Sequence, residues 1–286
     1  MSYNENIGRK VHFFYWILAI FVISVCAMLP GGIQAEESKE VKADGKKLKK
    51  LGMVDPEKYV SKSLVFSPDG RHAIWLNRSN DQYQLLLDGT PGPSFEGIYR
   101  PPVVLSPDGR RLFFILENKT DHHLSVVTDG TIGPGFDTIL SGTPLFSPDS
   151  RHIAYAGALQ EKHQVFLDGT PSAKYELVGH LTFSPDSRRF AYAAQKDKKR
   201  FMVVDGVPGP SFDDVFPTGF SLDSRHLVYY ATRGKKHLIM VDDHPGSEYD
   251  MIGPVRFNPV QGADSPSIGY IGLLGNELIE VTQPLP

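Results

Sequence analysis

The chain has 286 residues, and its 30 Lys and Arg against 33 Asp and Glu give a formal net charge of −3. Its 41% hydrophobic residues are enough for a packed core and too few for a polytopic membrane protein. The near-neutral charge argues against a nucleic-acid partner, which selects a strongly basic surface. The single cysteine, Cys26, excludes an intramolecular disulfide framework and a thiolate zinc cluster.

Residues 1–35 have the order of an export segment. Arg9 and Lys10 precede an apolar run over residues 11–29, and the small residue Ala35 follows. This order predicts a secretory signal peptide, but the run is also long enough to serve as a retained membrane anchor. In both cases the rest of the chain is exported, to the periplasm or beyond the cell. Residues 36–56, rich in lysine, are predicted to form a charged linker.

The rest of the chain is built from repeats of a short motif, Phe-Ser-Pro-Asp-Gly/Ser-Arg in its fullest form. The serine of this motif, replaced by asparagine in the last copy, stands at Ser67, Ser106, Ser147, Ser184, Ser221 and Asn258. Successive markers are 37 to 41 residues apart. The repeats are predicted to cover residues 64–102, 103–143, 144–180, 181–217, 218–254 and 255–282.

Each repeat predicts four short strands. The first ends at Ser-Pro, because proline cannot donate a hydrogen bond to a sheet. An Asp-Gly or Asp-Ser turn leads to the second strand, and a third strand runs into an Asp-Gly hairpin turn. The fourth carries an aromatic residue, at Phe95, Phe136, Tyr175, Phe212 or Tyr249. Four strands per repeat of this length are typical of a propeller blade. The sequence therefore predicts an all-β fold: one β-propeller over residues 57–286, with six blades of four antiparallel strands.

The closure of the ring is predicted from the two ends of the repeat region. The last repeat provides three strands, and Tyr59-Val60 precedes the first marker much as Tyr249 and its successors precede the last. We therefore expect residues 57–61 to complete the sixth blade and to remove the free edges of the ring.

The repeats resemble those of TolB-like propellers, which are relatives of WD-type blades. The resemblance is clearest over Phe66–Trp75, Phe146–Tyr155 and Phe183–Tyr192, and it extends over most of residues 57–282. It implies a propeller in the periplasm that binds protein partners of the cell envelope. The family's separate α/β domain has no counterpart in the linker at residues 36–56.

An acidic residue follows the fourth-strand aromatic in five repeats, at Glu96, Asp137, Glu176, Asp213 and Asp250. Five carboxylates at equivalent places form a periodic negative ring, which is a candidate binding surface for cationic ligands. The alternative is that these acids lie at solvated sheet edges, where charge discourages other strands from adding. The aspartates of the two turns in each repeat are assigned to turn formation, because their side chains hydrogen-bond to nearby backbone.

Metal binding and catalysis find little support in the sequence. His72, His152 and His226 share one repeat position, but equivalent positions on separate blades lie too far apart to bind one zinc ion. No nucleophile elbow, phosphate-binding loop or His-Glu-x-x-His motif is present. We therefore predict no catalytic residue, no metal ligand and no cofactor.

The sequence favours an exported, non-enzymatic propeller that binds a protein or peptide at one rim or at the mouth of the central channel. One alternative is an enzyme of the channel, a lyase or metal-assisted hydrolase acting on polysaccharide or lactone, because sites shared among blades leave no local motif. Another is a membrane-anchored structural module. The longer turn at residues 259–267 is a further candidate for binding.

Overall fold

A computed structural model of the chain describes residues 41–43, 46–48, 50–80, 82–97, 100–258 and 266–286. The chain divides into two compact units, Met1–Met53 and Val54–Pro286. In the first unit, β1 (Val41–Ala43) pairs with β2 (Lys46–Leu48). The predicted export segment, residues 1–35, lies outside the described residues. The described part of the chain contains no helix that could cross a membrane.

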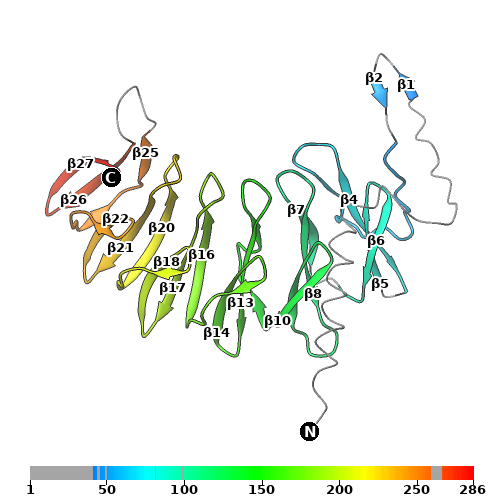
Figure 1. Cartoon of the computed structure of the whole chain (residues 1–286), viewed down its shortest axis with the longest axis horizontal. Helices are drawn as coiled ribbons and strands as arrows, with labels where there is room; N and C mark the ends of the chain where they lie inside the picture. The colour runs from blue at the N-terminus through cyan, green and yellow to red at the C-terminus, as the bar shows by residue number, and fades with distance from the viewer. Residues whose placement is uncertain (1–40, 44–45, 49, 81, 98–99, 259–265) are drawn as a thin grey trace, which may run out of the picture. The chain divides into compact units, whose positions relative to one another are not determined.

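The second unit consists of six antiparallel sheets that follow one another in chain order, from cyan to red in Figure 1. The first three sheets contain β3 (Val65–Phe66), β4 (Ala73–Ser79), β5 (Gln82–Leu87) and β6 (Thr90–Phe95); β7 (Arg100–Leu105), β8 (Leu112–Glu117), β9 (Leu124–Thr128) and β10 (Thr131–Phe136); and β11 (Thr138–Ile139), β12 (Leu145–Phe146), β13 (Ile153–Leu159), β14 (Lys162–Leu167) and β15 (Thr170–Pro171).

The last three sheets repeat the same order of antiparallel pairings. They contain β16 (Leu177–Phe183), β17 (Phe190–Lys196), β18 (Lys199–Val204) and β19 (Val207–Pro208); β20 (Asp214–Phe220), β21 (Leu227–Arg233), β22 (Lys236–Val241) and β23 (His244–Pro245); and β24 (Met251–Ile252), β25 (Arg256–Asn258), β26 (Ser267–Leu274) and β27 (Glu277–Pro284). The first strand is split in the third and sixth sheets, where β11 and β12 both pair with β13, and β24 and β25 both pair with β26.

The turn chemistry predicted for the aspartates is confirmed. In the first turn of the fourth blade, Ser184 Oγ donates to Asp186 Oδ1 at 2.7 Å, and the same carboxylate oxygen accepts from Arg188 N at 3.1 Å. In the first four blades the third and fourth strands are joined by Asp-Gly turns in which both residues have positive φ, as at Asp205 (51°) and Gly206 (83°). This conformation matches the right-handed twist of the paired strands, which explains the Asp-Gly preference.

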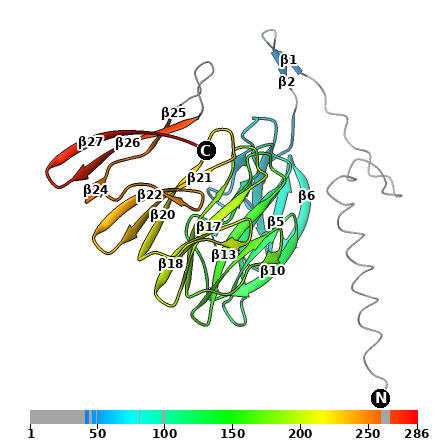
Figure 2. The same ribbon diagram turned by 60° about the vertical axis from the view of Figure 1, so that its left-hand side comes forward.

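The core lies between neighbouring sheets. One buried cluster joins Met202 of the fourth blade to Leu227 and Met240 of the fifth, and another joins Ile239 of the fifth to Tyr270 of the sixth. A single sheet exposes an apolar face, and stacking against its neighbour buries that face. Figure 2 shows this succession of sheets from a second direction.

The predicted aromatic anchors of the fourth strands are confirmed: each is buried, with at most 8% of its surface exposed. Each anchor packs against the second strand of the following blade. Phe95 meets Phe114 edge-on, with ring centroids 4.8 Å apart, and Tyr249 lies in the same way against Tyr270 at 6.0 Å. The aromatic residue therefore fastens each blade to the next.

The position of residues 57–61 differs from the prediction. Tyr59 forms an antiparallel bridge with Asn77 of β4, and Val60 N donates to Leu76 O at 2.9 Å. This is the register in which the first strands of other blades begin, since Val215 pairs with Ala231 and Ile252 with Gly272. The segment therefore belongs to the first blade. In the fifth and sixth blades, too, the residues that directly follow the acid (Asp213 or Asp250) start a new first strand. We predicted that residues 57–61 complete the sixth blade. The structure instead pairs Tyr59 and Val60 with β4 of the first blade.

Together the sheets define the class of this molecule. Six successive antiparallel sheets, each stacked on the next through an apolar face, are the blades of a β-propeller, and the predicted all-β class is confirmed.

Candidate functional site

Four of the five predicted acids link one blade to the next. Asp137, Asp213 and Asp250 each accept a hydrogen bond from the turn between the second and third strands of the following blade. The donors are Gln160 N at 2.9 Å, Gly234 N at 2.7 Å and Gly275 N at 2.7 Å. Glu176 accepts from two such groups, Asp197 N at 3.0 Å and Lys198 N at 3.4 Å. A two-residue turn thus presents its N–H groups to the carboxylate of the preceding blade.

Two of these acids also pair with a lysine. Lys199 Nζ lies 2.5 Å from Asp213 Oδ1, and Lys236 Nζ lies 2.6 Å from Asp250 Oδ1. The lysine hydrogen bond, followed by the turn N–H, holds the pKa of each aspartate below its ordinary value of 3.8. Gln195 and the turn N–H of Asp197 likewise lower the pKa of Glu176. These carboxylates are therefore charged and engaged at neutral pH.

Glu96 has a different environment. No described residue donates a hydrogen bond to its carboxylate, which is exposed and lines a cavity of about 420 Å³. The cavity lies between the first and second blades, and its walls also include Tyr83, Glu117, Lys119 and His122. The five predicted acids thus do not converge on one site, because four are used between blades and Glu96 faces a separate opening.

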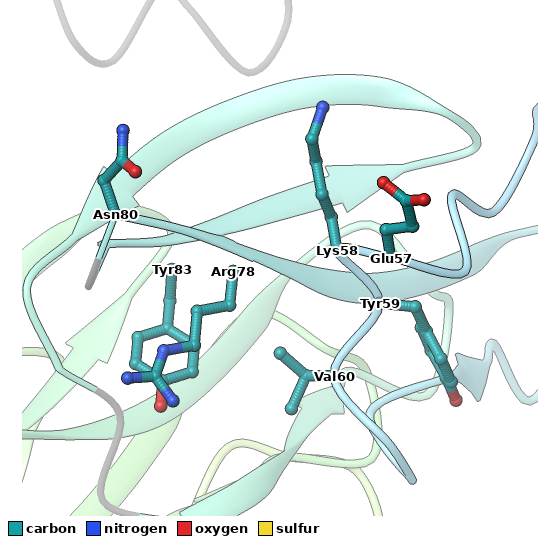
Figure 3. A pocket seen from close by; sticks show the side chains of 7 residues that line it. All are labelled: Glu57, Lys58, Tyr59, Val60, Arg78, Asn80 and Tyr83. Atoms are coloured by element: carbon teal, nitrogen blue, oxygen red, sulfur yellow. The ribbon is translucent and has the colours of Figure 1, made fainter.

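A second cavity, of about 550 Å³, adjoins the first and shares Arg78 and Tyr83 with it. Figure 3 shows these two side chains together below the segment that carries Lys58 and Glu57. The Arg78 guanidinium lies over the Tyr83 ring, 5.6 Å from its centroid. Both cavities therefore open beside the turn between β4 and β5.

The histidines of the shared repeat position face aspartates rather than one another. His72 Nδ1 lies 2.7 Å from Asp88 Oδ2, and His226 Nδ1 lies 2.8 Å from Asp242 Oδ2. Arg189 takes the same place in the fourth blade, where its Nε donates to Asp205 at 3.0 Å. Each side chain thus ties the start of a second strand to the hairpin of its own blade. Among the described residues, no group of three His, Cys, Asp or Glu side chains could hold a metal ion.

The first strands carry an exposed apolar surface that sequence reasoning missed. First strands of neighbouring blades contact each other, as β3 does with β7 and β16 with β20. On three consecutive blades these strands expose Leu177 (41%), Phe216 (55%) and Met251 (62%). His180 of β16 meets the Phe216 ring edge-on at 4.5 Å. We call Leu177, His180, Phe216 and Met251 the inner-strand surface.

A pattern in the sequence could have revealed part of this surface. In β20, exposed Asp214 and Phe216 alternate with buried Val215. Alternation places Val215 on the core face and Phe216 on the opposite face, so an aromatic residue there has no place in the core. The longer turn predicted to bind, residues 259–267, falls for the most part outside the described residues.

Comparisons with known proteins found solved structures of low sequence identity. No family model and no curated protein matches the sequence. The chain is similar to TolB from Acinetobacter baumannii, at 16% identity over 65% of this chain and 54% of that one, with a TM-score of 0.33. It is also similar to the dihydro-heme d1 dehydrogenase NirN, at 16% identity over 76% of this chain and 53% of that one (TM-score 0.35). The propeller domain of the Trilobed protease from Pyrococcus furiosus has 9% identity over 74% and 78% of the two chains (TM-score 0.38). The chain spans about half the length of the first two proteins.

Proposed function

We propose that this protein is an exported, non-enzymatic β-propeller that binds a protein or peptide partner of the cell envelope through its inner-strand surface. The observation that supports this proposal is the exposure of Leu177, Phe216 and Met251 on the first strands of three consecutive blades. Large apolar side chains that gather on one part of a surface are typical of interaction sites.

The chemistry of the inner-strand surface fits a protein ligand. Aromatic and methionine side chains are enriched at the centres of protein interfaces, where they lose water on binding. Asp214, which stands between these apolar positions along the ring, is paired with Arg200 at 2.7 Å. An apolar centre beside an ion pair is suited to an extended segment that has both apolar and polar side chains.

The location follows from the predicted export segment. Arg9 and Lys10 before the apolar run support a propeller on the outer side of the membrane, whether or not cleavage follows Ala35. Mass spectrometry of the protein from its native envelope tests this step. A mature chain that begins at Glu36, or an intact chain in the membrane fraction, agrees with export, whereas recovery from the cytoplasm contradicts it.

The binding role is tested with a surface variant. Leu177→Ser, Phe216→Ser and Met251→Ser together remove the exposed apolar groups without opening the core, so the propeller is expected to fold. Ile132→Ser, Val207→Ser and Leu278→Ser form the matched control, because these residues are at least as exposed but lie on third or fourth strands. We expect the first variant, and not the control, to lose a partner that the wild type retains after mild crosslinking.

A further inference from the structure

The crevice between the first and second blades differs from the other junctions between blades. Elsewhere an acid of one blade accepts an N–H from the two-residue turn of the next, as at Asp213 with Gly234 and Asp250 with Gly275. In the second blade, six residues, 118–123, join the second and third strands. Within that loop His122 Nδ1 lies 2.9 Å from Glu117 Oε1. No described N–H of the loop reaches Glu96, and the cavity of about 420 Å³ lies there instead.

The crevice also differs in the group that supplies a positive charge. Where the acid is Asp213 or Asp250, a lysine at the start of the same blade's third strand, Lys199 or Lys236, holds it by an ion pair. In the first blade the equivalent residue is Gln82, which pairs with Ser79 as Lys236 does with Arg233. The first blade therefore has the carboxylate of this arrangement without its ammonium group.

Two of the other junctions show what chemistry fits the crevice. The carboxylates of Asp213 and Asp250, at the equivalent position, each bind a lysine ammonium group together with a backbone N–H. Glu117, whose Oε1 pairs with His122, adds a second carboxylate to the cavity wall, and the Tyr83 ring, with the Arg78 guanidinium over it, lies beside it. The adjoining cavity of about 550 Å³ extends the opening past the turn between β4 and β5, which gives room for the chain on either side of a bound side chain.

We propose that this crevice binds a lysine side chain on an extended segment of a partner protein. The ammonium group lies between the carboxylates of Glu96 and Glu117, and the segment's backbone runs along Tyr83 into the adjoining cavity. The partner's lysine takes the place of the lysine and the turn that the protein itself provides beside Asp213 and Asp250. It is separate from the inner-strand surface and does not depend on it.

The test uses the full-length protein in a mild detergent and a fluorescent, end-capped peptide of alternating serine and lysine with three lysines. Fluorescence anisotropy measures its affinity at low salt. We expect Glu96→Gln with Glu117→Gln to weaken binding by about fivefold or more, since exposed charge pairs contribute modestly. Lys119→Ala, which removes a like charge from the wall, is expected to strengthen binding. Acetylation of the peptide lysines is expected to abolish it.

The controls distinguish binding at this crevice from general electrostatic attraction between the basic peptide and the protein. Glu161→Gln with Glu277→Gln removes two exposed carboxylates from other hairpins, so the change in net charge is the same. Unchanged affinity in this variant supports the site, and equal weakening overturns it. Lack of binding to the wild type, equal binding of the acetylated peptide, or no effect of the Glu96 and Glu117 substitutions also overturns it. The Leu177, Phe216 and Met251 variant is expected to bind the peptide normally, so failure of either proposal can be recognised separately.

Discussion

The ring of Tyr249 lies directly against the backbone of Gly272, so a methyl group at position 272 would overlap the Cδ1 and Cε1 atoms of the ring. Phe136 lies in the same way on Gly157. We expect Gly272→Ala to destabilise the protein by about 1–3 kcal/mol, because overpacking forces the ring or the strand to move. Gly179→Ala is the control, since a Cβ there meets nothing within 4 Å. Equal stability of the two variants in urea unfolding would contradict the packing account.

Ser224 joins the fourth and fifth blades, because its Oγ accepts from Asp186 N at 3.0 Å. It does so from a left-handed backbone conformation, with φ of 65°. We expect Ser224→Ala to cost about 1–2 kcal/mol, because a partly buried N–H loses its acceptor. Ser224→Gly loses the same bond but suits the positive φ, as Gly109 does in the second blade, so it should cost less. A higher melting temperature for the alanine variant than for the glycine variant would refute this.

The link between Asp250 and the sixth blade predicts a dependence of stability on pH. Lys236 and the Gly275 N–H lower the pKa of Asp250 in the folded state below 3.8. The carboxylate therefore stabilises the fold above the unfolded-state pKa, and this contribution is lost as the pH falls through the folded-state value. Asp250→Asn should be less stable than the wild type at neutral pH, and the difference should narrow below about pH 4. Urea unfolding across this range checks it, with Glu161→Gln as control; a difference independent of pH would count against the link.

Arg189 reaches from the fourth blade to the fifth. Its guanidinium lies 5.3 Å from the centroid of the Phe220 ring, and its Nη1 donates to Arg225 O, while Nε pairs with Asp205. Arg189→Ala should destabilise the protein by about 1 kcal/mol, because the group is partly exposed. Arg189→His should cost less, since histidine makes the same aspartate pair in other blades. Chemical denaturation measures the stability of both variants. If the histidine variant is as unstable as the alanine variant, the pairing of Arg189 with Asp205 does not stabilise the fold.

Much of the fold could be predicted from the repeats. The Ser-Pro-Asp turn and the Asp-Gly hairpin act within a few residues, so each appears in the local sequence. The aromatic anchors Phe136 and Tyr249 were also predictable, because one residue type recurs at one repeat position. The placement of Tyr59 was not, since the pairing partner of a strand is not encoded in its local sequence: we expected this segment in the sixth blade, and the structure pairs it with Asn77 of the first.

The site was harder to predict because it depends on contacts between blades. The ring of acids looked uniform along the chain, yet Asp250 and Glu96 differ in the turn that each faces. That difference arises from the loop length of the following blade and from Gln82 at a position where the third, fourth and fifth blades have lysine. The exposure of Phe216 likewise depends on which face of β20 packs against a neighbouring blade. Strand alternation separates the two faces but does not say which of them is the core face.

The most direct measurement of the central claim is partner capture with wild type and surface variants in parallel. Tagged full-length protein is crosslinked mildly in its native envelope, and everything recovered is identified by mass spectrometry. We expect a reproducible, near-stoichiometric partner that is retained by the wild type and by the Ile132, Val207 and Leu278 variant, and that the Leu177, Phe216 and Met251 variant loses. Recovery of the propeller alone, or equal recovery of the partner by all three proteins, would contradict the claim that the inner-strand surface binds a protein.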